Sequence, residues 1–125
     1  MIKLMFCLRR LPSLSRDEFQ RYWRGTHAKL VQKHAQALRI HRYVQTHTLT
    51  SPVNAALQAS RGAPEEYDGV AELWWRSQEE LAEATASEAG RRASLELLED
   101  ERRFIDLARS PLWIAEEHSV LDPPG

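Results

Sequence analysis

The sequence lacks the features that would define several large classes of protein. It contains a single cysteine, Cys7, among 125 residues, so the chain holds no disulfide framework and suits a reducing compartment. The opening apolar run, residues 1–10, is too short and too soon interrupted by charge to be a signal peptide or a membrane span. With 17 basic and 18 acidic residues, the whole chain carries no excess of positive charge that would attract nucleic acid or an anionic membrane. We expect a cytoplasmic protein with one domain, residues 1–125, and a small or neutral partner.

Motifs for metal and nucleotide chemistry are missing too. There is no HExxH pair, no pair of cysteines and no glycine-rich phosphate loop. Five histidines are present, but they do not have the spacing of a metal site. We therefore expect no metal ligands.

The most informative feature that is present is an amphipathic helix with aromatic rings and a histidine on one face. Ser15 and Glu18 form a capping-box pattern, and the helix is expected to run to about His34. Phe19, Trp23 and His27 follow at steps of four residues, which place side chains on one helical face. A titratable ring is thus predicted to point inward among aromatic side chains.

The remaining pattern predicts four strands and a second helical region. Strands are expected at residues 2–9, 39–49, 68–76 and 112–121, with a long connection at 50–66 that has room for one short helix. Ser77 and Glu80 repeat the capping-box pattern, and helix is expected from there to Ala108, interrupted at Gly90. The order predicts an α+β protein with the ferredoxin-like βαββαβ fold and a four-stranded antiparallel sheet.

Large apolar residues on the strands exceed what one helical layer can cover. A homodimer with sheet faces in contact is therefore expected. The residues that suggest it are Phe6, Val44, Trp74, Trp75 and Trp113.

Several segments together resemble the EthD family of small dimeric α/β-barrel proteins. The strongest is residues 14–28, with its serine cap, Phe, Tyr-Trp and His-Ala, and the supporting pieces are residues 42–47, 67–75, 100–106 and 116–120. The resemblance implies a ferredoxin-like protomer, a dimer built on the sheets and a pocket between helices and sheet. It also implies chemistry without a metal or organic cofactor, since relatives include polyketide decarboxylases, dehydratases and methylmuconolactone isomerases. Founding members accompany the oxidative degradation of ethyl tert-butyl ether.

His27 is the first candidate for proton transfer, because an imidazole exchanges protons near neutral pH. A structural histidine bonded to a backbone carbonyl is the alternative. Tyr43 and His47 share one face of the second strand and are candidates for an oxyanion donor and a proton relay, or else polar edge residues. Asp68 is a candidate for orienting an imidazole, or else a turn residue.

Aromatic side chains are candidates for binding a flat substrate, or else for the core and the interface. They are Phe19, Trp23 and Trp75. The charge run at residues 96–103 is interpreted as a solvated helix face.

These features predict a cofactor-independent isomerase or lyase, such as a decarboxylase or dehydratase. Its substrate is a small hydrophobic oxygenated compound: a lactone, phenol or polyketide-like molecule. The alternatives are a non-catalytic binding or accessory protein for an oxygenase degradation system, and cofactor-free oxygenation of an electron-rich phenol.

Overall fold

The computed structural model describes all residues from Met1 to Gly125 and contains one four-stranded antiparallel sheet. The strands are β1 (Ile2–Leu8), β2 (Arg42–His47), β3 (Gly69–Trp75) and β4 (Leu112–Ala115), in the order β2-β3-β1-β4. This order, with helical segments after β1 and β3, is that of the ferredoxin-like fold, which confirms the predicted fold class.

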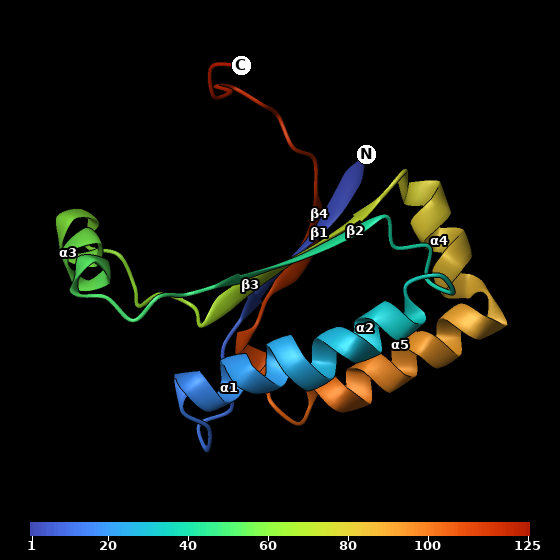
Figure 1. Ribbon diagram of the computed structural model, residues 1–125, viewed down its shortest axis with the longest axis horizontal. Coiled ribbons are helices and arrows are strands. Elements are labelled where there is room, and N and C mark those ends of the chain that lie inside the picture. The colour runs from blue at the N-terminus through green and yellow to red at the C-terminus, as the bar shows by residue number, and fades with distance from the viewer.

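The helices that follow β1 and β3 lie on one face of the sheet. A first helical segment comprises α1 (Arg16–Tyr22), a π-helical turn (Trp23–His27) and α2 (Ala28–His34). The second comprises α4 (Gln78–Ala86) and α5 (Glu88–Glu101), and a short 3₁₀ turn spans Leu107–Arg109. In Figure 1 the first segment and α5 run side by side beneath the sheet, and no helix covers the opposite face.

The register of the strands assigns each side chain to a face. Leu4 pairs with Leu73, Phe6 with Ala71, and Tyr43 with Leu73, so all of these side chains share the helix-covered face. Trp75 lies on that face too. Phe6 and Trp75, two of the residues that suggested an uncovered apolar face, are therefore covered by helices instead.

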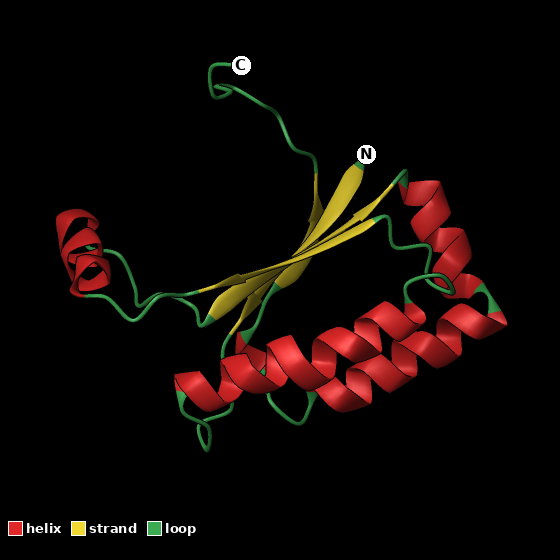
Figure 2. Cartoon of the chain, in the orientation of Figure 1, coloured by secondary structure: helices red, strands yellow, loops and turns green.

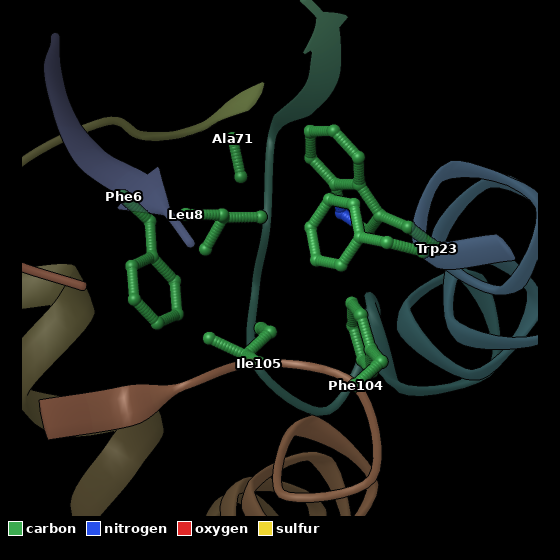
Figure 3. Packing of buried hydrophobic residues seen from close by; sticks show 7 residues of the cluster. Phe6, Leu8, Trp23, Ala71, Phe104 and Ile105 are labelled. Carbon is green, nitrogen blue, oxygen red and sulfur yellow. The ribbon is translucent and has the colours of Figure 1, made fainter. Parts of the chain in front are cut away.

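The core cluster joins the sheet to both helical segments. Figure 3 shows Phe6, Leu8 and Ala71 from the strands packed with Trp23 from the first helix and with Phe104 and Ile105, which follow α5. Phe19 completes this cluster and is fully buried. At about 1.5–3 kcal/mol for each large apolar side chain buried, this cluster is a main source of stability.

The first helix begins as predicted, and the second differs in detail. Ser15 accepts a hydrogen bond from the Glu18 amide while the Glu18 side chain accepts one from the Ser15 amide, so the capping box is complete. The second region breaks at Ser87, which caps α5, rather than at Gly90. Gly90 is needed because an added Cβ would lie 1.8 Å from the Ala84 carbonyl oxygen.

The end of the chain also departs from the prediction. Helix α5 ends at Glu101 rather than Ala108, because Ile105 forms a β-bridge with Arg10 and so leaves the helical path. The last strand ends at Ala115 rather than Leu121, since it pairs only with residues 3–6 of β1.

The long connection holds the short helix that the sequence allowed. Helix α3 (Pro52–Arg61) begins at the N-cap Ser51 and ends at Gly62 in the left-handed region. It lies beyond the ends of β2 and β3, apart from the other helices (Figure 2), and none of its residues is buried. Of all the helices in the structure, none has the length and apolar character required to cross a membrane.

Candidate functional site

A cavity of about 230 Å³ lies between the helices and the covered face of the sheet. Its walls are mainly apolar side chains from β1, β2, β3 and both helical segments. Four lining residues are not hydrophobic: His27, Thr85, Ser94 and Glu101. Tyr43 adds a phenol, and no lysine or arginine lines the space. An apolar cavity with a few polar groups is the usual form of a small-molecule site.

His27 lies in the π-helical turn and is held by a carboxylate. Its Nδ1 is 2.7 Å from Oδ2 of Asp100, and only 5% of the residue is exposed. An ionised carboxylate only accepts hydrogen bonds, so the proton of a neutral His27 lies on Nδ1. The Nε2 atom has no hydrogen-bond partner in the protein, and because His27 lines the cavity, we expect the Nε2 lone pair to be available to a ligand there. This is the arrangement of a general base with an orienting acid.

Electrostatics keep the His27 ring neutral and Asp100 ionised. Burial lowers the pKa of His27 below its ordinary 6.5, although the Asp100 carboxylate opposes this shift. Burial alone would raise the pKa of Asp100, but hydrogen bonds from Tyr22, His27 and Arg103 hold that pKa below its ordinary value. The Tyr22 hydroxyl donates to Oδ1 of Asp100 over 2.5 Å, and Arg103 donates to the same oxygen over 3.3 Å.

Tyr43, predicted as an oxyanion donor, lines the same cavity as His27. Its hydroxyl oxygen accepts a hydrogen bond from Nε2 of Gln45 over 2.7 Å, which leaves the O–H free to donate. Burial raises the pKa of Tyr43, so the phenol keeps its proton at neutral pH. The structure thus brings Tyr43 and His27 to one cavity from a strand and a helix.

His47, predicted as a relay, does not line the cavity. Its ring stacks on Trp23 with 4.4 Å between centroids, and its Nε2 lies 2.8 Å from Oε1 of Gln45. It faces an open surface hollow together with Gln20 and Arg24. Its contacts place it behind the Trp23 wall, where it supports the indole.

Asp68, predicted as the group that orients an imidazole, lies away from the cavity. Its carboxylate accepts from the side chain of Arg10 over 2.6 Å and from Arg16 over 2.9 Å, and from the Arg10 amide over 2.8 Å. These bonds tie the end of β1 and the start of α1 to the start of β3. The carboxylate that contacts His27 is Asp100, so Asp68 is left out of the proposed catalytic set below.

Two of the three predicted aromatic wall residues line the cavity. Trp23 does so, with its indole packed so close to Gly69 that an added Cβ would lie 2.4 Å from it. Trp75 also lines it, anchored by a 2.7 Å bond from Nε1 to the Leu38 carbonyl. Phe19 does not line it, because it lies behind Trp23 and Phe104 in the core.

Asp100 and Glu101 are the site residues that sequence reasoning missed. Interpreting residues 96–103 as a solvated face was wrong for this pair, since Asp100 is 3% exposed and Glu101 lines the cavity. A signal was present: Ala93 and Leu97 are buried on the same face of α5, and Asp100 and Glu101 continue their three- and four-residue steps.

The site has no evident metal centre. No group of three or more His, Cys, Asp or Glu side chains is arranged to hold a metal ion. Its polar groups are suited to moving protons and to donating hydrogen bonds.

Comparison with known proteins places this chain in a family. The model of the EthD domain matches residues 11–108, so the chain belongs to the EthD family. An EthD family protein from Bacillus halodurans C-125 is 21% identical, with a TM-score of 0.62 over 94% of this chain and 99% of the other. An EthD-like protein from Ralstonia eutropha JMP134 is 18% identical, with a TM-score of 0.61 over 92% and 89%.

A third solved structure is a dimeric protein of unknown function with a ferredoxin-like fold from Bacteroides fragilis NCTC 9343. It is 6% identical, with a TM-score of 0.57 over 93% of this chain and 95% of the other. The search of curated proteins found no significant match. The resemblance to the EthD family seen in the sequence is thereby confirmed, and these structural likenesses establish the fold.

Proposed function

We propose that this EthD family protein is a cofactor-independent enzyme of the isomerase or lyase type, acting on a small hydrophobic oxygenated compound. The observation that carries the proposal is the His27–Asp100 pair at the wall of an apolar cavity. A desolvated neutral imidazole, held in one tautomer, is a base matched to neutral pH.

The roles of the side chains follow from their positions. His27 takes a proton from a carbon next to a carbonyl group through Nε2, while Asp100 stabilises the imidazolium that forms. Tyr43 donates its hydroxyl hydrogen to the oxygen on which negative charge develops. Trp23 and Trp75 form apolar walls that exclude water and contact the hydrophobic body of the substrate.

Deuterium exchange tests the proposal without a known substrate. Lactones, aryl ketones and aromatic polyketides are incubated in D₂O, and loss of the α-hydrogen signal is followed by NMR. We expect the wild type to accelerate exchange for at least one compound. We expect His27→Gln to lose about 100-fold or more, the usual scale for a general base.

His34→Gln is the matched control. His34 lies on the same helical segment but bonds Glu96 outside the cavity, so exchange is expected to stay at the wild-type rate. Equal exchange in wild type and His27→Gln would contradict the role of His27. Saturable binding with no exchange would favour the alternative, a binding or accessory protein for an oxygenase system.

We also propose a homodimer through the uncovered sheet face. Met5, Val44, Glu72, Trp74 and Trp113 share that face, and Trp113 is 47% exposed. Support comes from the dimeric neighbour of the same fold. Light scattering is expected to give twice the chain mass of 14.4 kDa, and the monomer mass at micromolar concentration would contradict the proposal.

A further inference from the structure

Glu101 is a cavity residue with no role in the proton transfer described so far. It is the last residue of α5, and its carboxyl group has no hydrogen-bond donor or cation as a partner in the protein. Its neighbour Asp100 accepts from three side chains. A half-buried carboxyl group without a protein partner is costly to keep, and the cavity is where a ligand would satisfy it.

The surroundings of Glu101 favour the carboxylic acid over the carboxylate. The titratable groups near it are Asp100 on its own helix and His27 and Tyr43, which line the same cavity; no lysine or arginine lines that cavity. Burial and the negative charge of Asp100 raise the pKa of Glu101 to about 7. At neutral pH a large share of molecules therefore carry a hydrogen-bond donor at this position.

Tyr43 lines the same cavity and carries a second O–H donor. The negative charge of Glu101 contributes to the raised pKa of Tyr43, so the two groups are close enough to interact electrostatically. The Tyr43 oxygen already accepts from Gln45, which directs its own O–H elsewhere. Two O–H donors in an apolar cavity are suited to one oxygen atom with developing negative charge.

We propose that Glu101, as a carboxylic acid, donates a hydrogen bond beside Tyr43 to the carbonyl oxygen of an uncharged ketone or lactone substrate. The inference rests on the proposed function and narrows its substrate class. Substrates that are themselves carboxylates are disfavoured, because no cation lines the cavity and Glu101 would repel them once ionised.

The step balances with these groups alone. Nε2 of His27 takes the α-proton, the C–H electron pair forms a carbon–carbon double bond, and the carbonyl π pair moves onto oxygen. Glu101 and Tyr43 keep their protons and hydrogen-bond that oxygen. In a substrate with a β,γ carbon–carbon double bond, the proton returns from His27 to the γ-carbon and the electron pair on oxygen re-forms the carbonyl, which completes an isomerisation and restores every group.

The test uses a ketone that accepts hydrogen bonds but does not titrate. Binding of 1-tetralone labelled with ¹³C at its carbonyl is measured by NMR at pH 6.0 and pH 8.5. With a pKa of about 7, the acid fraction of Glu101 falls from about nine-tenths to about one-thirtieth. If only the acid form binds, affinity falls about 30-fold, and the carbonyl signal of the bound ketone shows hydrogen bonding at pH 6.0.

Two variants isolate Glu101 from other titrating groups. Glu101→Gln keeps an N–H donor that does not titrate, so its affinity is expected to be the same at both pH values. Glu99→Gln changes an exposed carboxylate on the same helix and is expected to keep the 30-fold dependence. Affinity independent of pH in the wild type, pH dependence retained in Glu101→Gln, or no binding up to the solubility of the ketone would each overturn the inference.

The outcome is separable from that of the proposed function. Ketone binding that depends on Glu101, without α-hydrogen exchange in the wild type, would reject the enzyme and keep the carbonyl site. Exchange that depends on His27, together with ketone binding that does not depend on Glu101, would support the enzyme and reject the carbonyl site at Glu101.

Discussion

Two aspartates in this structure are equally buried, at 3% exposure each, and serve different ends. Asp68 contacts the guanidinium groups of Arg10 and Arg16, whereas Asp100 contacts the imidazole of His27 and the phenol of Tyr22. In both, bonds from the partners outweigh burial and hold the pKa below its ordinary value. The difference lies in the partners.

An arginine stays charged at any pH the protein meets, so Asp68 and its partners form a fixed ionic tie between three elements. An imidazole changes charge near neutral pH, so Asp100 can control where its proton lies. Only the carboxylate of the second aspartate contacts a side chain that lines the cavity. Burial of a carboxylate therefore says little about its role until its partner and the nearest cavity are known.

The largest effect is expected from Asp100→Asn. Because Tyr22 and Arg103 donate to Oδ1, the amide oxygen will take that place and the NH₂ group will face His27. His27 must then accept at Nδ1 and carry its proton on Nε2, so it loses its function as a base. We expect α-hydrogen exchange to fall about 100-fold, as far as when His27 itself is replaced, because Asp100 acts only through that base.

Tyr22→Phe is the matched control for this variant. It removes one hydrogen bond to Asp100 but leaves the carboxylate on Nδ1 of His27. A loss of less than tenfold is expected. Full exchange activity in folded Asp100→Asn would show that the pair does not set the tautomer.

A smaller effect, on stability rather than on rate, is expected from Asp68→Asn. The variant removes the buried negative charge next to Arg10 and Arg16. It also places the NH₂ group of the new asparagine, a donor, opposite the Arg10 backbone amide, which is a donor too. We expect a loss of about 3 kcal/mol in the free energy of unfolding, measured with urea, and an unchanged exchange rate in the folded protein. If the exchange rate of Asp68→Asn fell as far as that of Asp100→Asn, the two aspartates would not have the different roles assigned to them here.

Acid titration sharpens the same contrast. The pKa of Asp68 is lowered on folding, so its contribution is complete above its ordinary value of 3.8 and is lost as the pH falls through the lower folded value. The pKa of His27 is also lowered on folding. As the pH falls below 6.5, the unfolded chain takes up a proton on this histidine before the folded protein does, so the free energy of unfolding starts to fall there, at a higher pH than for Asp68. We therefore expect the free energy of unfolding, measured from pH 7 downward, to change with pH equally in the wild type and in Asp68→Asn until the pH falls below 3.8. Below that pH, only the wild type loses the contribution of Asp68.

Local patterns predicted most of the fold. The capping box and the four-residue steps placed Phe19, Trp23 and His27 on one buried helical face, as observed. Alternation placed Tyr43 and His47 on one face of a strand. Which face the helices cover depends on the pairing of β2 with β3, and no local pattern contains that information.

The site was less accessible from sequence, because its key pairs join distant segments. His27 and Asp100 are 73 residues apart, and Arg10 and Asp68 are 58 apart, so spacing could not reveal which carboxylate meets which partner. The exposure of the end of α5 was predicted wrongly for another reason. Its many charges suggested solvent, although the buried Ala93 and Leu97 already indicated that the face of Asp100 and Glu101 turns inward.

The most direct test of the central claim is the protonation of the His27 ring, read from its ¹⁵N chemical shifts in labelled protein at pH 7.5. The account predicts a neutral ring with the proton on Nδ1, bonded to Asp100, and an unprotonated Nε2. A proton on Nε2, whether in the other neutral tautomer or in an imidazolium, would contradict the claim that the cavity holds a base.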